Sequence, residues 1–360
     1  MRTRGTRERK AACGTAWILA ACVLAAPAAS QEVQSLAGQD VAVYTLTGRV
    51  QVVRGSGADV VVRITRGGAD ASQLQVETGQ IDGRSTLRVV FPDDEIVYPE
   101  MGRGSNTQMS VRADGTFGDG NGRSGSRVRI RGSGSGLEAW ADLVVEVPAG
   151  RTFAAYLGVG EMEATGVSGD IRLETGSGSV TANDITGSLD VDTGSGGITV
   201  SRVSGNLHVD TGSGRVDVTD VAGEDVELDT GSGRVRVSGV ETSRFVVDTG
   251  SGSVSLEAIS APTVLVDTGS GAVEIELLVD VGQLDIDTGS GSVTVRAPDD
   301  LGAMVEIDTG SGGIDLDFPL EVTSVRRDRV QGRLGDGQGT IRIDTGSGSI
   351  RILRSTAGQI

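Results

Sequence analysis

Nine copies of one polar turn carry the residues whose types and spacing could do chemistry. The turn reads DTGSG in every copy except the first, which reads ETGSG. The acidic residues that begin the copies are Glu174, Asp192, Asp210, Asp229, Asp248, Asp267, Asp287, Asp308 and Asp344. An apolar strand leading into Asp-Thr-Gly-Ser is typical of the aspartic-protease active-site loop, and a file of carboxylates is a ligand set for calcium. The third interpretation is a structural turn, in which Asp accepts a backbone N–H and glycine supplies positive φ.

The spacing of the copies favours the structural turn. Through Asp308, consecutive copies are 18 to 21 residues apart, whereas a protease needs two loops that face each other so that two carboxylates share one proton. A fixed period instead places the carboxylates side by side on one edge. The Gly-rich calcium repeat has a nine-residue period, which this sequence lacks. We therefore expect no catalytic residue, no metal site and no cofactor.

Few other residues are candidates for catalysis or metal binding. His208, the only histidine, precedes Val209 at an outward strand position, so we expect it at the surface. Both cysteines, Cys13 and Cys22, lie in the N-terminal segment, which leaves the rest of the chain without a thiol nucleophile. Trp140 is the only tryptophan after Trp17, and this disfavours a sugar-stacking cleft. A polysaccharide-active or calcium-binding β-helix protein remains the alternative function.

Short stacked strands are the elements that must position the turns. Val216, Val218, Val221, Val226 and Leu228 alternate with polar residues, which is strand periodicity. Strands this short cannot bury a face alone, so each unit must stack on the next. The sequence predicts an all-β protein, a parallel β-solenoid or β-helix with 18 to 20 residues per rung over 151–360. We expect it to be right-handed, as parallel crossovers nearly always are.

The same alternation places the turn residues. Thr230 and its equivalents should form an inward column whose hydroxyls bond along the stack, with the aspartates outward. The interval of 36 between Asp308 and Asp344 equals two periods and predicts one rung whose turn has diverged. Arg351 and Arg354 would then put charge on the last edge and discourage end-to-end stacking.

The first half of the chain predicts less regular β structure. Residues 31–150 contain strand-like runs at 41–46, 49–53, 59–64, 74–77 and 86–91, which we interpret as an irregular N-terminal part that caps the solenoid. The Gly-rich stretch near 99–136 lacks a GK[ST] phosphate-loop signature. It reads as a long loop, either without order or as a functional excursion.

The N-terminal segment, 1–30, reads as a signal peptide. Five basic residues precede an apolar run from Ala11 to Ala26, too short for a spanning helix, and cleavage is expected before Gln31. The alternative is a lipid anchor at Cys22. Either way we expect export to the periplasm, cell surface or exterior, with no transmembrane helix in the mature chain. The net charge of −17 disfavours nucleic acid as a partner.

Three stretches resemble the bacterial envelope proteins that form the "putative adhesin" family, a domain of unknown function with a single-stranded β-helix fold. They are GRVQVVRGSGADVVVRI at 48–64, VPAG at 147–150 followed by repeated rungs, and GDGQGTIRIDTGSGSIRI at 335–352. The resemblance implies envelope location, an adhesive or scaffolding role and no catalytic residues to carry over. We therefore expect an exported, non-enzymatic envelope protein that presents repetitive acidic faces to a cell-surface or envelope component, protein or glycan.

Overall fold

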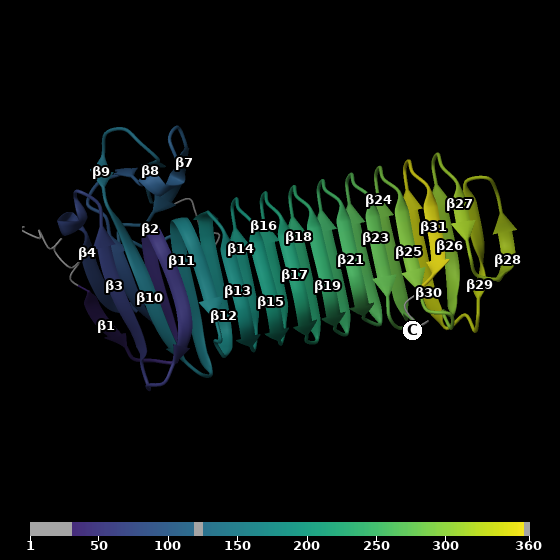
Figure 1. The fold of residues 1–360 in the computed structure, drawn as a ribbon, viewed down its shortest axis with the longest axis horizontal. Coiled ribbons are helices and arrows are strands. Elements are labelled where there is room, and N and C mark those ends of the chain that lie inside the picture. Colours follow the sequence, from purple (N-terminus) through teal and green to yellow (C-terminus); the bar gives the residue numbers. More distant parts are fainter. Residues whose placement is uncertain (1–30, 119–124, 356–360) are drawn as a thin grey trace, which may run out of the picture.

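The computed structural model describes residues 31–118 and 125–355 and shows an elongated rod of stacked β-strands (Figure 1). The only helical elements in these ranges are two short 3-10 turns, η1 (Ala71–Gln73) and η2 (Pro99–Met101). The prediction of an all-β parallel solenoid is confirmed. The predicted signal peptide at 1–30, with Cys13 and Cys22, lies outside the described residues.

Each regular rung has two short strands joined by the DTGSG turn. The strands are β12 (Gly169–Ser177), β13 (Val180–Thr186), β14 (Leu189–Thr193), β15 (Ile198–Ser204), β16 (Leu207–Thr211), β17 (Val216–Ala222), β18 (Asp225–Thr230), β19 (Val235–Glu241), β20 (Arg244–Thr249), β21 (Val254–Ser260), β22 (Thr263–Thr268), β23 (Val273–Leu277), β24 (Gln283–Thr288), β25 (Val293–Ala297), β26 (Ala303–Thr309) and β27 (Ile314–Leu316). We call the even-numbered strands of this set the first sheet and the odd-numbered strands the second sheet.

From β12 to β25, each strand pairs in parallel with its counterpart in the next rung, and the pairing is in register except for an irregularity between β21 and β23. Val191 of β14 lies opposite Val209 of β16, and Val209 lies opposite Leu228 of β18. The inward residues of both sheets share one core, in which Val209 and Val200 have no exposed surface. Each such valine contributes roughly 1.5 kcal/mol or more to folding, so the apolar column is the main source of stability.

The turn backbone continues the ladder of hydrogen bonds between rungs. Gly212 N–H donates to the Thr193 carbonyl at 3.1 Å, and Gly214 N–H donates to the Ser232 carbonyl at 3.0 Å. Within the described residues, no carboxylate of the eight turn aspartates accepts a turn N–H. The predicted Asx bond is therefore wrong, and glycine amides of the turns, such as those of Gly212 and Gly214, bond to neighbouring rungs instead.

The inward column of turn threonines is confirmed, since all nine are buried. Its hydrogen bonding is only partly as predicted. The hydroxyls of Thr288, Thr309 and Thr345 donate to a glycine carbonyl of an adjacent rung at 3.4, 2.9 and 3.0 Å. In the described part of the chain, the other six threonine hydroxyls have no hydrogen-bond partner.

Long bent strands begin the rod. The N-terminal strands are β1 (Glu32–Leu36), β2 (Asp40–Gly55), β3 (Val60–Gly67), β4 (Gln75–Ile81), β5 (Arg84–Val90), β10 (Trp140–Pro148) and β11 (Arg151–Thr165). β2 and β11 pair in parallel along both sheets and bend at Gly48 and Gly160, where φ is +129° and +145°. Strands β1 and β4 pair antiparallel with β3 and β5 and close this end. The domain boundary at residue 150 stays a prediction.

A second, small sheet covers the outer face of these bent strands. It contains β6 (Glu95–Val97), β7 (Asn106–Val111), β8 (Ser126–Arg131) and β9 (Leu137–Glu138). Its inner residues Ile96 and Ile130 pack on the outward side chains Tyr44 and Tyr156, whose rings stack 4.4 Å apart. For the described residues, the prediction of a long loop near 99–136 is therefore wrong, because outward aromatics on β2 and β11 need an apolar cover.

The last rung lies between two earlier ones. The remaining strands are β28 (Leu320–Val325), β29 (Arg329–Leu334), β30 (Gly339–Thr345) and β31 (Ile350–Arg354). β30 pairs in parallel with both β24 and β26, and β31 with both β25 and β27. The chain thus leaves a gap after β25, forms the antiparallel hairpin β28–β29 beside β26, and returns to fill the gap.

Two sequence-based predictions are corrected by this order. The 36-residue interval is a hairpin excursion and not a rung with a diverged turn, because β28 and β29 run antiparallel. Arg351 and Arg354 lie on β31, which has partners on both sides, so they do not form the last edge. The last strand of the first sheet is β28.

We expect Gly196→Ala to destabilise the fold by more than about 2 kcal/mol. Gly196 has a φ of +147°, and a Cβ there would lie 1.9 Å from the Gly178 carbonyl oxygen. Gly197→Ala is the matched control, since the nearest atom to its Cβ would be 3.9 Å away. Urea unfolding should show a large loss for the first variant and little change for the second. Equal losses would contradict the tight stacking of the turns.

Candidate functional site

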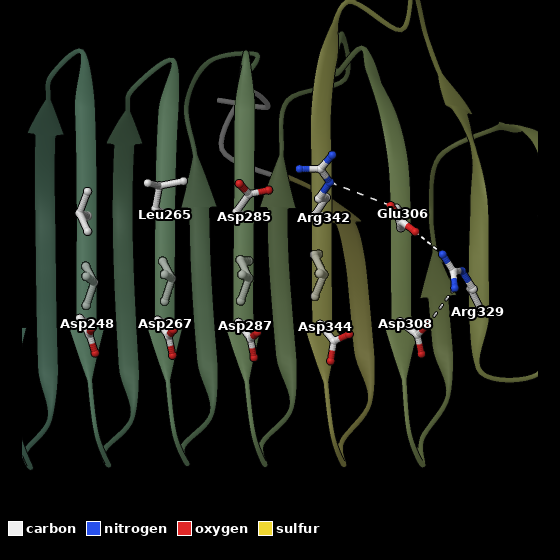
Figure 2. Close-up of a pocket in the computed structure, with 15 residues that line it drawn as sticks. Asp248, Leu265, Asp267, Asp285, Asp287, Glu306, Asp308, Arg329, Arg342 and Asp344 are labelled. Atoms are coloured by element: carbon white, nitrogen blue, oxygen red, sulfur yellow. Dashed lines mark hydrogen bonds and ion pairs between the residues drawn. The ribbon is translucent and has the colours of Figure 1, made fainter.

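The turn aspartates form one continuous column on the outer face of the first sheet. Each is the next-to-last residue of its strand, and the in-register pairing aligns them from rung to rung. In spatial order this aspartate ladder consists of Asp192, Asp210, Asp229, Asp248, Asp267, Asp287, Asp344 and Asp308. Figure 2 shows its last five members on adjacent strands. The predicted single file of carboxylates is confirmed.

Three members of the ladder, Asp192, Asp229 and Asp344, have pKa values raised above that of an isolated aspartate. Burial raises the pKa of Asp229, and the neighbouring charges of Asp210 and Asp248 raise it further. Burial also raises the pKa of Asp344, with additional repulsion from Asp287 and Asp308. Adjacent carboxylates about 4.8 Å apart repel by about 0.9 kcal/mol in water. Parallel stacking therefore builds a surface of high negative charge density. A bound cationic partner would reduce the repulsion between its carboxylates.

A second outward row lies two residues before the ladder. From rung to rung it contains Asp190, His208, Glu227, Val246, Leu265, Asp285, Arg342 and Glu306. Val246 and Leu265 give this row an apolar middle. Arg342 follows Asp285 on the next strand, so charged residues of both signs bound one side of the apolar part.

The apolar middle and the ladder line a shallow groove of about 570 Å³ (Figure 2). At one end Arg329 of β29 forms ion pairs with Glu306 and, at 3.7 Å, with Asp308. Arg342 Nε lies 4.0 Å from the other oxygen of Glu306. The residues lining the groove include no hydroxyl, thiol, imidazole or ammonium group, so its chemistry is that of carboxylates, guanidinium groups and methyl groups.

The ladder geometry does not match the protease chemistry that the turn motif suggested. Its carboxylates lie side by side on one face, whereas a shared proton requires two that face each other across a cleft. In the described ranges, no group of three or more His, Cys, Asp or Glu residues is placed to hold a metal ion. The turn motif acts as a stacking element that also presents charge, because its glycine amides bond to adjacent rungs and its aspartates align from rung to rung.

His208 lies at the surface, as predicted, with Nδ1 3.9 Å from Glu227 Oε2.

Sequence reasoning missed Arg329 and Arg342 as parts of the groove. Arg342 precedes Asp344 by two residues, as Asp285 precedes Asp287, and this signal places it in the second row. Its adjacency to Asp285 depends on the return of β30, which periodicity alone does not reveal.

Within the described residues, no helix has the length and apolar character needed to cross a bilayer.

Comparison with known proteins gives one family match. Residues 142–353 match the family model described as Toastrack DUF4097. A search of the curated proteins found no match. One similar solved structure is that of "a putative cell adhesion protein" from Clostridium sporogenes, with 12% identity over 91% of this chain and 99% of that chain. Its TM-score is 0.20, too low for any conclusion about fold or function.

We expect Asp229→Asn to stabilise the protein at neutral pH. A raised folded-state pKa means that ionisation opposes folding, so stability falls as pH rises above the ordinary aspartate range. The gain should be a few tenths of a kcal/mol, because Asp229 is exposed and salt screens it. Thermal unfolding at pH 7 and at pH 3 should show a gain at pH 7 and none at pH 3.

Asp225→Asn on the same strand is the matched control for this measurement. Asp225 pairs with Arg244 at 3.0 Å, so removing its charge should give no gain. Added salt should narrow the difference between Asp229→Asn and the unmodified protein. A stabilising effect of both variants, or of neither, would contradict repulsion along the ladder.

Proposed function

This chain belongs to the Toastrack DUF4097 family, and on that premise we propose that it is an exported, non-enzymatic cell-envelope protein that acts as an adhesin or scaffold. The aspartate ladder is the observation that carries the proposal. Eight carboxylates lie in register along one face of a rod. Such a face suits recognition by repeated contacts more than it suits chemistry at one point.

Repetition of the carboxylates allows individually weak contacts to give a useful affinity for a partner. A single exposed ion pair contributes about 0 to 1 kcal/mol, so one ladder carboxylate alone gives little affinity. A partner with cationic groups at a matching repeat engages several carboxylates together, and each further contact forms at a high effective concentration. The partner that fits is therefore an extended or repetitive surface or envelope component, protein or glycan, with spaced positive charges.

The groove beside the ladder allows the protein to distinguish between cationic partners. Val246 and Leu265 give an apolar strip in reach of the carboxylates, and Arg342 and Arg329, which both pair with Glu306, bound one end of the groove. A partner must then supply a cationic group over the ladder and an apolar group over the strip. A purely polar cation satisfies only the first requirement.

Export is supported by the sequence of residues 1–30, where a basic stretch precedes a short apolar run. Cleavage before Gln31 leaves a protein in the periplasm, at the cell surface or outside the cell. Lipidation of Cys22 would tether the same rod to a membrane. Both outcomes place the ladder outside the cytoplasm, where it can meet envelope components.

We expect the purified protein to bind cells or isolated envelope, and Asp229→Asn/Asp248→Asn/Asp267→Asn to weaken that binding at least about tenfold. The matched control is Glu241→Gln/Glu257→Gln/Glu274→Gln, which removes three exposed charges from the second sheet. Salt should weaken binding of the unmodified protein. Equal binding by both variants, calcium binding in a titration, or turnover of polysaccharide would count against the proposal.

Mass spectrometry of the exported protein tests the location. We expect a mature chain that begins at Gln31, because residues 28–30 are small and follow the apolar run. Detection of a lipidated chain that begins at Cys22 would show a lipid anchor in place of cleavage before Gln31. An unprocessed chain retained in the cytoplasm would contradict export.

A further inference from the structure

The two sheets of the rod end at different places near the C-terminus. The first sheet continues beyond β26 with β29 and then β28, whereas the second sheet ends at β27. Strand β28 pairs with β29 on one side, and within the described residues no strand pairs with its other side. Its backbone donors and acceptors on that side form an open edge at the end of the rod (Figure 1).

The open edge also exposes apolar side chains. Val322 and Val325 of β28 are 56% and 60% exposed, more than any other large apolar residue in the described ranges. A bulge places both on one face, because Val322 lies opposite Gly332 and Val325 lies opposite Val330. Val330 and Leu334 belong to that face and are buried. The two valines therefore continue the core-facing row of the first sheet beyond the last covering strand.

Apart from this bulge, strand β28 lacks the side chains that usually protect an edge. Natural edge strands carry lysine, proline or inward-pointing charge that prevents pairing with another strand. The six residues of β28 read LEVTSV, and the single charge, Glu321, lies opposite Arg333 and pairs with it at 2.6 Å. Nothing on the core-facing side of the strand opposes contact with another apolar strand.

The sequence of this edge complements itself. In an antiparallel pairing of two copies that sets Val322 opposite Val325, Thr323 lies opposite Ser324 and Glu321 lies opposite Arg326. The pairs fall on consistent faces: Glu321 shares the outer face with Arg333, and Arg326 lies opposite Arg329, to which its N–H donates across the hairpin turn at 2.8 Å. Two-fold symmetry repeats each pair, giving two valine contacts and two ion pairs.

We propose that β28 pairs antiparallel with β28 of a second copy of this chain and joins two rods end to end. The partner is identified by charge complementarity and by the row of valines that the joint covers. The other end of the rod closes with different strands, β1 and β4, so the contact gives a closed dimer and not a filament. The inference does not depend on the proposed adhesive function.

The test measures the molar mass of the purified full chain by light scattering and by sedimentation over a range of concentrations. One strand pair is a small interface, so we expect a monomer–dimer equilibrium that shifts to the dimer as concentration rises. Val322→Lys/Val325→Lys should weaken the dimer at least about tenfold, because like charges then meet at the centre. Circular dichroism and thermal unfolding confirm that the variant folds.

Two further experiments distinguish pairing through β28 from other contacts between two copies of the chain. Val33→Lys/Val279→Lys changes two exposed valines elsewhere and should leave the dimer unchanged. Glu321→Arg alone and Arg326→Glu alone should each be monomeric, whereas an equal mixture of the two should dimerise, because the mixed pair has both ion pairs again, one of them with its charges reversed. A monomer at every concentration, a dimer that survives Val322→Lys/Val325→Lys, or failure of the mixture to associate would overturn the proposal.

Discussion

Parallel, in-register stacking of equivalent residues is the constraint on which the rest of this structure depends. Stacking places valine on valine, and each buried valine contributes roughly 1.5 kcal/mol or more. It also places aspartate on aspartate, at a cost of about 0.9 kcal/mol per pair in water before screening by salt. Because each rung adds several buried apolar residues and one ladder carboxylate, the core outweighs the repulsion. The charged face is thus a consequence of the architecture that builds the core.

The same constraint explains the composition of the turns. Gly214 approaches the carbonyl oxygen of Gly196 so closely that a Cβ would lie 1.8 Å from it. Glycine amides of the turns bond to adjacent rungs, and the aspartate side chains face solvent. A side chain that appears suited to stabilising its own turn is therefore available for contact with a partner.

The sequence predicts the parts of the fold that repeat and misses the parts that occur once. The alternation of Val216 and Val218 with polar residues, and the spacing of the turns, indicate the rung, the inward threonines and the outward aspartates. Periodicity cannot order the rungs, because any DTGSG rung stacks on any other; the place of Asp344 between Asp287 and Asp308 depends on the hairpin. The small sheet was missed although the apolar run around Tyr44 indicates a strand buried on both faces.

The inserted place of β30 and β31 has a consequence for how the chain reaches its native form. Ribosomes synthesise a polypeptide from its N-terminus, so β26 is present before β30 exists. The site beside β24 accepts either strand, because both end in Ile-Asp-Thr. During folding, the site beside β24 must therefore stay empty until β30 is available, or β26 must first pair with β24 and then be displaced. Strands β30 and β31 enter between strands that were synthesised before them.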